Sequence, residues 1–251
     1  GGDSPGMNAV LKSFIDKCLA LGVTPYIYRK GIEGVLKNDG QEYTEEAQRR
    51  LLATPGSVIQ CNKRFKLIEQ EGAEYQAIEN LRKNKCDALI IVGGDGSVRL
   101  SDKLFRAGYP VVALPGTIDN DLPVYCLGFD SALNATIELI QMLEWTSRSM
   151  ERVHLAEVYG AGSGHFALSL AHAVNPQAVL VNEMKDIGID IDEFIDNYLI
   201  DKLTLGLKRK DKSHIVIVSE MIKHGYMIDP KGGVSGLSKA LEFKLRQRGL
   251  E

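Results

Sequence analysis

Two loops of this chain combine glycines with carboxylates at a spacing suited to phosphate chemistry. The first, residues 93–97, reads G-G-D-G-S, and the second, residues 115–121, reads P-G-T-I-D-N-D. Glycines let the backbone approach a polyphosphate and aim N–H groups at it, and the carboxylate of Asp95 can hold Mg²⁺. Asp119 is placed to take a proton from a hydroxyl, while Asp121 can steer a metal or the backbone. These residue types predict phosphoryl transfer.

Both loops directly follow apolar runs, residues 88–92 and 111–114, that are typical of buried parallel strands. Further along the chain, apolar runs keep alternating with amphipathic stretches, which indicates repeated βα units and a parallel sheet. Ligands of open α/β sheets bind at the carboxyl ends of the strands. We therefore expect the two loops to emerge at one edge of one sheet.

The periodicity places the individual elements. Helices are predicted at residues 7–21, 75–85, 97–107, 130–144, 163–173, 191–208 and 235–248. Strands are predicted at residues 23–28, 86–92, 109–114, 153–159, 178–181 and 214–219. A domain change is expected near residues 126–130, where the two loops end and a new βα series begins.

Composition limits the classes of function. The chain has 251 residues and a net charge of −3, which argues against a nucleic-acid or anionic-membrane partner. It contains no apolar stretch near 18 residues and no charged, apolar leader, so we expect a cytoplasmic protein without a membrane span. The scattered cysteines favour reduced thiols over a metal cluster. They are Cys18, Cys61, Cys86 and Cys126.

Three motifs in order carry a family resemblance. Residues 1–8, G-G-D-S-P-G-M-N, together with the loops at 93–97 and 115–121, resemble 6-phosphofructokinase, the ATP-dependent sugar-phosphate kinase of glycolysis. The resemblance continues through G-F-D-S-A at 128–132 and E-V-Y-G at 157–160. It implies that the family's first strand, before the glycine-rich turn, and its C-terminal segment are absent from these residues.

The resemblance implies a fold and a reaction. The fold is α/β, with two Rossmann-like three-layer domains whose sheets are mainly parallel. Residues 1–128 would form the nucleotide-binding domain, and residues 129–251 a sugar-phosphate-binding domain that is incomplete at its C-terminus. The reaction would convert Mg·ATP and fructose 6-phosphate into ADP and fructose 1,6-bisphosphate.

The resemblance also assigns roles to residues. Asp119 resembles the general base for the sugar C1 hydroxyl, Thr117 the contact to the transferred phosphoryl group, and Asp95 the Mg²⁺ ligand. Glu220 resembles a carboxylate that binds sugar hydroxyls. Arg152 resembles an arginine that reaches the 6-phosphate in a neighbouring subunit, as part of a homo-oligomer, a tetramer in the family. The remaining nucleotide contacts implied are Gly2, Gly94, Gly96 and Ser97, with Lys63 or Arg64 supplying a cation. The remaining substrate contacts implied are Ile118, Asp121, Tyr159 and Gly160.

Gly96 and Gly116 indicate which phosphoryl donor is used, and Ala161 concerns catalytic activity. Pyrophosphate-using members of the family carry an aspartate where this chain has Gly96 and a lysine where it has Gly116, which makes ATP the better donor assignment. The family's M-G-R segment reads Tyr159-Gly160-Ala161 here, so an arginine contact is lost at Ala161.

Other interpretations stay open. A non-catalytic or regulatory subunit would keep the nucleotide loops yet lack arginine contacts. A lipid kinase or a nicotinamide-dinucleotide kinase shares a G-G-D-G loop, although the loop at 115–121 weakens that alternative. Among single residues, Asp121 could cap a turn, Arg152 could be a surface charge, and Glu220 could be a solvated strand end.

Overall fold

The computed structural model describes residues 4–43, 57–61, 70–209 and 214–250. The chain divides into two compact units, Gly1–Asp130 and Ser131–Glu251, and each is described here by itself. Both units contain parallel strands connected through helices, so the α/β class expected from the sequence is confirmed. None of the helices in the described ranges is both long and apolar enough to cross a bilayer.

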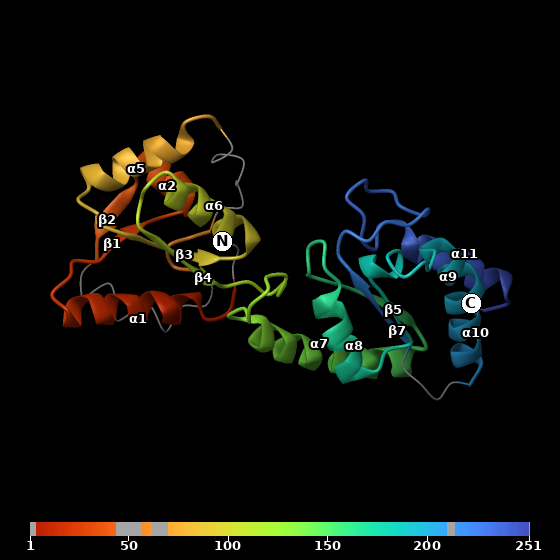
Figure 1. The fold of residues 1–251 in the computed structure, drawn as a ribbon. Helices are drawn as coiled ribbons and strands as arrows, with labels where there is room; N and C mark the ends of the chain where they lie inside the picture. The colour runs from red at the N-terminus through yellow and green to blue at the C-terminus, as the bar shows by residue number, and fades with distance from the viewer. Residues whose placement is uncertain (1–3, 44–56, 62–69, 210–213, 251) are drawn as a thin grey trace. The chain divides into compact units, whose positions relative to one another are not determined.

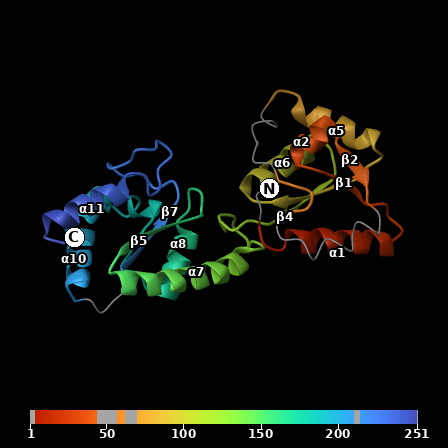
Figure 2. The ribbon, with the colours of Figure 1, turned by 180° about the vertical axis from the view of Figure 1, so that it is seen from behind.

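The first unit contains two pairs of strands. Its elements are α1 (Met7–Ala20), β1 (Tyr26–Tyr28), α2 (Ile32–Lys37), β2 (Gly40–Glu42), α5 (Ala73–Lys83), β3 (Leu89–Gly93), α6 (Asp95–Arg106) and β4 (Val111–Pro115). Strands β1 and β2 pair antiparallel, whereas β3 and β4 pair in parallel with Gly93 opposite Pro115. In Figures 1 and 2, α1 lies on one side of the strands and α2, α5 and α6 lie on the other.

The core of the first unit lies between the strands and helices α2, α5 and α6. Leu81 and Leu104 are fully buried there, and Leu89, Ile91 and Val111 pack against the cluster from β3 and β4. The intervening strand residues point away from it. They are exposed by 41% at Ile90, 54% at Val112 and 37% at Leu114. The strands expected to be buried are therefore only partly buried: the side chains that face the helices are more covered than Ile90, Val112 and Leu114.

Helix α2 and strand β2 were not predicted from the sequence. Both are short, and β2 contains only three residues, too few to show a period. They depend on two glycines with crowded surroundings. A Cβ at Gly34 would lie 1.8 Å from the carbonyl oxygen of Arg29, and one at Gly40 would lie 2.4 Å from the ring of Tyr26. The antiparallel pairing thus departs from the parallel sheet that the sequence led us to expect.

The second unit is built on one parallel sheet. Helix α7 (Phe129–Met150) leads into it, and the sheet order is β5-β7-β6. The remaining elements are β5 (Val153–Val158), α8 (His165–Val174), β6 (Ala178–Leu180), η2 (Asn182–Met184), α9 (Ile191–Phe194), η3 (Ile195–Leu199), α10 (Ile200–Arg209), β7 (His214–Ser219) and α11 (Leu237–Gln247). Strand β7 is central, and all six of its residues are buried.

The helix predicted at residues 191–208 is present but not regular. Residues Ile195–Leu199 form a π-helical turn between α9 and α10. A π turn inserts a residue into the helical ladder, which changes the face that the following turn presents. Ile195, Leu199 and Leu203 nevertheless all remain fully buried. Periodicity predicted this helix because its apolar face continues through the insertion.

Candidate functional site

The two loops rich in glycine and carboxylate emerge side by side in the first unit. Strand β3 ends at Gly93 and β4 ends at Pro115, and these residues are opposite each other in the parallel register. The backbone N–H of Gly116 donates to the carbonyl of Gly93 at 2.9 Å, which extends the pairing into the loops. Parallel pairing of adjacent strands therefore brings the residues after both strands to one sheet edge, as their sequence pattern requires.

The second loop is organised by Thr117, which is 9% exposed. Its hydroxyl accepts a hydrogen bond from the backbone N–H of Asp119 at 3.2 Å and lies 3.3 Å from Asp119 Oδ2, to which it can donate. The side-chain oxygen Oδ1 of Asn120 accepts from the backbone N–H of Cys126 at 3.2 Å, which links this loop to the residues that follow it. The Asp119 carboxylate is half-buried, whereas Asp121 is exposed. These contacts hold the Asp119 backbone in place beside a hydroxyl.

Two glycines let the loops approach each other. A Cβ at Gly94 would lie 3.2 Å from the Thr117 Cβ and 3.3 Å from its hydroxyl oxygen, tighter than ordinary side-chain contact. A Cβ at Gly116 would lie 2.9 Å from Val92 Cγ1. Side chains at these positions would push the two loops apart. The structure thus gives both glycines a packing role, in addition to any role in leaving room for a ligand.

Helix α6 begins inside the first loop, with Gly94 as its N-cap. Ser97 and Val98 donate their backbone N–H groups to the carbonyl of Gly94 at 2.9 Å and 3.1 Å. The N-terminus of a helix carries a partial positive charge and N–H groups that favour anions. Helix α6 is 12 residues long and directs this end toward the same edge as Thr117. This edge of the sheet therefore carries a partial positive charge, which favours binding of a phosphate group.

Asp95, the predicted metal ligand, forms an ion pair with Arg99 one turn further along α6. This hydrogen bond to the guanidinium holds the pKa of the Asp95 carboxyl below its ordinary value. The Asp95 side chain is 40% exposed, so it remains reachable from solvent. Within the described residues no three acidic, histidine or cysteine side chains cluster as a metal site. A single carboxylate fits Mg²⁺ only where phosphates and waters complete the octahedron, as is usual for nucleotide-bound magnesium.

A second set of predicted residues meets in the second unit. Val158 and Ser219 are opposite each other at the ends of β5 and β7, and the backbone N–H of Glu220 donates to the carbonyl of Val158 at 2.9 Å. Glu220 Oε1 accepts from the backbone N–H of Gly160 at 3.1 Å and from that of Ala161 at 2.6 Å. The predicted sugar-binding carboxylate is thus bound to the loop that should carry the missing arginine.

The loop after β5 has an unusual backbone. Gly160 has φ +155° and Ala161 has φ +50°, so a residue other than glycine adopts the left-handed conformation. A Cβ at Gly160 would lie 2.4 Å from the carbonyl oxygen of Ser163. Glu220 stabilises this shape by accepting the N–H groups of Gly160 and Ala161, and Ser163 N–H adds a hydrogen bond to the Gly160 carbonyl at 2.8 Å. Tyr159 is 62% exposed at the start of the loop.

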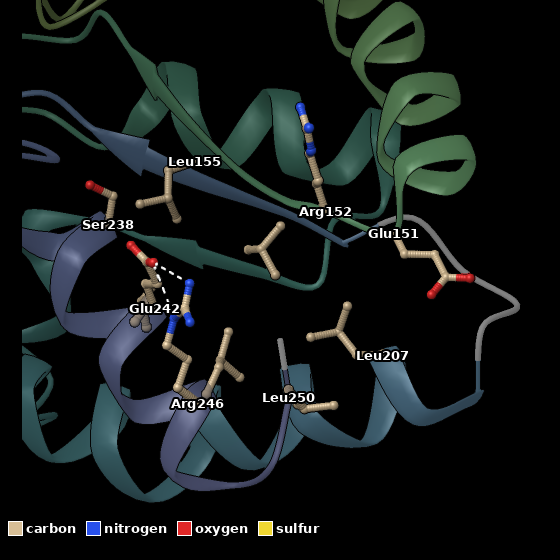
Figure 3. A pocket seen from close by; sticks show the side chains of 11 residues that line it. Glu151, Arg152, Leu155, Leu207, Ser238, Glu242, Arg246 and Leu250 are labelled. Atoms are coloured by element: carbon tan, nitrogen blue, oxygen red, sulfur yellow. Dashed lines mark hydrogen bonds and ion pairs between the residues drawn. The ribbon is translucent and has the colours of Figure 1, made fainter.

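Arg152 lies at the opposite end of β5. The strand has six residues, which corresponds to about 20 Å between its ends. Arg152 borders a cavity of about 330 Å³ whose apolar lining includes Leu155, Leu207 and Leu250. In Figure 3 its guanidinium points away from the ion pair between Glu242 and Arg246. The second unit therefore brings Tyr159, Gly160 and Glu220 together and leaves Arg152 apart from them.

The structure accounts for the other predicted residues in two ways. It places Gly94, Asp95, Gly96, Ser97, Thr117, Ile118, Asp119 and Asp121 in the paired loops of the first unit. Gly2, Lys63 and Arg64 lie outside the described residues. Sequence reasoning missed Arg99, although its spacing of four residues from Asp95 on a helix is a readable signal. It also missed that Glu220 would bind the Gly160–Ala161 backbone, for which the sequence carries no local signal.

Comparison with known proteins agrees with this architecture. The sequence model of the family described as phosphofructokinase matches residues 1–248. An ATP-dependent 6-phosphofructokinase from Brevibacillus brevis is 33% identical over 222 residues, covering 88% of this chain and 67% of the relative. One from Clostridioides difficile is 32% identical over 244 residues, covering 96% of this chain and 71% of the relative.

Solved structures show the same fold. Phosphofructokinase from Saccharomyces cerevisiae superposes with a TM-score of 0.75 at 25% identity, covering 100% of this chain and 36% of the yeast chain. A pyrophosphate-dependent phosphofructokinase from Nitrosospira multiformis gives 0.77 at 22% identity, covering 100% and 65%. The chain spans about two thirds of the bacterial ATP-dependent relatives and about a third of the yeast chain. Since the family model matches nearly the whole sequence, this chain belongs to the phosphofructokinase family.

Proposed function

We propose that the protein transfers the terminal phosphoryl group of Mg·ATP to the C1 hydroxyl of fructose 6-phosphate. The observation that supports this most directly is the paired loop edge of the first unit, where Gly94 packs against Thr117 and Thr117 is hydrogen-bonded to Asp119. Phosphoryl transfer needs an anion-binding backbone and one positioned base, and the N-terminus of α6 and the Asp119 carboxylate support assigning these two roles to this edge. Residues 1–128 would bind the nucleotide and residues 129–251 the sugar phosphate.

In the proposed reaction Asp119 accepts the proton of the C1 hydroxyl. The C1 oxygen forms a bond to the terminal phosphorus while the bond from that phosphorus to the bridging oxygen breaks, and ADP leaves with the electron pair. Thr117 contacts the transferred group, and the backbone around Gly94, Gly96 and Ser97 binds the nucleotide phosphates. Bound Mg²⁺ would neutralise phosphate charge, with Asp95 as its protein ligand. Gly2 and either Lys63 or Arg64 complete the proposed nucleotide contacts.

Five residues from loops at strand ends are proposed to contact the sugar phosphate. Ile118 and Asp121 belong to the loop of the first unit, and Tyr159, Gly160 and Glu220 to the loops of the second. Arg152 is proposed to serve the 6-phosphate site of a neighbouring subunit in a homo-oligomer, in keeping with its place at the far end of β5. The protein would act in the cytoplasm on small molecules.

A coupled assay of the protein would test donor and acceptor together. ATP and pyrophosphate are each supplied with fructose 6-phosphate and with other hexose phosphates. Turnover with ATP and fructose 6-phosphate alone supports the proposal. Turnover only with pyrophosphate would correct the donor, and turnover only with another sugar would correct the acceptor.

A second candidate, a non-catalytic subunit, is favoured by Ala161, where the family carries an arginine. A guanidinium–phosphate hydrogen bond contributes about 1.5–3 kcal/mol, which corresponds to roughly 10- to 150-fold in transition-state binding. If the chain is an impaired kinase, Ala161→Arg should raise kcat/KM for fructose 6-phosphate by up to that factor. The backbone there is already left-handed with a Cβ in place, so the substitution adds little new strain. No turnover in either protein would favour the non-catalytic subunit.

A further inference from the structure

The loop after β5 crosses the carboxyl edge of the sheet in the second unit. The strand order is β5-β7-β6, so the connection from β5 to β6 through α8 passes over β7. A Cβ at Gly160 would lie 3.7 Å from Ser219 Oγ, at the end of β7. A Cβ at Gly164 would lie 2.5 Å from the Cβ of Val181, which directly follows β6. We call residues 159–164 the crossing loop.

The far end of the crossing loop is held by Glu183, a residue that the proposed reaction does not use. Glu183 lies in η2, and its Oε1 accepts the backbone N–H of Gly164 at 2.7 Å. Its Oε2 is shielded from solvent and has no hydrogen-bond partner among the described residues. A Cβ at Gly164 would lie 2.5 Å from that oxygen, so a larger residue would displace the carboxylate. Gly164 is also the N-cap of α8, where the helix dipole favours a negative charge.

The near end of the crossing loop is held in the same way by Glu220. Its Oε1 accepts the N–H groups of Gly160 and Ala161, so carboxylates that follow two different strands hold three N–H groups of one loop. The loop's own hydrogen bonds close its centre. Ser163 N–H donates to the Gly160 carbonyl at 2.8 Å, and His165 N–H donates to Ser163 Oγ at 3.2 Å. The two ends therefore depend on side chains from distant segments.

The sequence of the crossing loop is typical of a phosphate-binding loop. Residues 160–164 read G-A-G-S-G between a parallel strand and a helix of 10 residues, and such loops offer backbone N–H groups to phosphates. Here the chain's own carboxylates occupy those groups, and their negative charges oppose a phosphate beside them. The carboxylates thus take the place of a bound anion and fix the backbone.

We propose that Glu183 is a positioning residue for the acceptor side of the proposed reaction. By holding Gly164, it fixes the course of the crossing loop, which carries the proposed sugar contacts Tyr159 and Gly160. Because the loop is held at both ends, losing one acceptor loosens the whole loop rather than Gly164 alone. The link to the acceptor rests on the proposed function, whereas the hold on the loop does not.

Amide hydrogen exchange tests the hold in residue-specific form. Glu183→Ala removes the acceptor of Gly164 and should speed exchange of the Gly164 amide by more than about tenfold relative to Asn175, which is bonded at the other end of α8. The Ala161 amide should also exchange more than about threefold faster, although its acceptor Glu220 is unchanged. An unaltered Ala161 amide would show that Glu183 only caps α8 and would overturn the proposal.

Two conservative variants decide the question if the alanine variant does not fold. Glu183→Gln retains an oxygen acceptor and should keep exchange at Gly164 and Ala161 within about threefold of the parent protein. Glu183→Asp retains the charge but is one methylene shorter, so it should speed exchange at both amides. Equal rates in the two variants, or the reverse order, would overturn the proposal.

Steady-state kinetics test the positioning role separately. Asp190→Ala is the matched control, because Asp190 caps α9 by accepting the N–H of Glu193 at 2.9 Å. Both alanine variants lose a carboxylate cap, but only Glu183→Ala should raise KM for fructose 6-phosphate, by more than about threefold, with KM for ATP unchanged. Equal changes in KM would overturn the role toward the acceptor. If the parent protein turns over no sugar phosphate, the proposed function fails, and the exchange measurements alone decide whether Glu183 positions the loop.

Discussion

Both units have loops at the carboxyl ends of adjacent parallel strands, but a carboxylate joins the two loops only in the second unit. In the first unit, adjacent parallel strands end at Gly93 and Pro115, and the loops meet through a glycine and a hydroxyl. In the second unit, adjacent parallel strands end at Val158 and Ser219, and the loops meet through Glu220. The contact between Gly94 and Thr117 involves no carboxylate, so the Asp95 side chain stays partly exposed to solvent. In the second unit, a carboxylate oxygen of Glu220 accepts hydrogen bonds from the backbone N–H groups of Gly160 and Ala161.

This difference teaches that a carboxylate at a strand end is not a ligand site by position alone. Glu220 accepts two backbone hydrogen bonds, and charge-assisted bonds of this kind are about twice as strong as neutral ones. Any sugar hydroxyl bound by Glu220 would therefore be bound by a group whose first task is to shape the Gly160–Ala161 turn. We therefore expect the reacting groups in the loops of the first unit, and a role for Glu220 in shaping the backbone of the second.

The largest expected effect comes from removing the proposed base. Asp119→Ser should lower kcat by about 10²–10⁴-fold, the usual range for loss of a general base, with little change in ATP binding. Steady-state assays and ATP calorimetry measure the two quantities. Asp102→Ser removes an exposed carboxylate from α6, away from the loops, and is the matched control. A near-normal kcat for the Asp119 variant would remove this residue from the mechanism.

A carboxylate placed in the first loop should weaken nucleotide binding. Gly96→Asp would put a negative charge against the ATP phosphates, and we expect the affinity for Mg·ATP to fall by more than about tenfold, or 1.4 kcal/mol. Phe105→Asp adds the same charge near the other end of α6, at a residue that is 67% exposed. Calorimetry should separate the two variants. Equal affinities would mean that the nucleotide does not bind at this loop.

The positioning role of Glu220 should appear in stability. Glu220→Ala leaves the N–H groups of Gly160 and Ala161 without their acceptor and should lower the free energy of unfolding by about 1–3 kcal/mol. Glu220→Gln keeps an oxygen acceptor and should cost less than half of that. Urea unfolding monitored by circular dichroism measures both. If the two variants lose the same stability, the charge matters and the hydrogen-bond geometry does not.

The smallest effect concerns the ion pair in the first loop. Arg99 lowers the pKa of Asp95 in the folded protein, so the pair stabilises the fold above the ordinary aspartate pKa, and this contribution is lost as pH falls through the lowered value. Since the pair is largely exposed, it contributes only about 0.3–0.5 kcal/mol. Arg99→Leu should return the Asp95 pKa toward its ordinary value in a carboxyl NMR titration, whereas Arg106→Leu should not. An unchanged Asp95 titration would contradict the pairing.

Most elements could be predicted because their patterns are local. The apolar runs at β3 and β4 and the amphipathic face of α7 are visible within a few residues, and so is the spacing of Asp95 and Arg99. The burial of β3 and β4 was harder to predict. An apolar run does not show whether other elements will cover one face of the strand or both, and here Ile90 and Val112 remain exposed.

The short elements α2 and β2 could not be predicted from the sequence for a related reason. Strand β2 has three residues and α2 has six, so neither extends over enough turns or alternations to show a period. Gly34 and Gly40 were visible in the sequence, but the atoms that crowd them belong to other segments. The antiparallel pairing with β1 becomes clear only once Tyr26 and Gly40 lie side by side.

The sequence by itself determined the family, the α/β class and the two loops of the first unit, because each depends on motifs or periods contained in short stretches of chain. Tertiary structure decided what cannot be local. Glu220 is 60 residues from Gly160, and only the parallel pairing of β5 with β7 brings its carboxylate to that backbone.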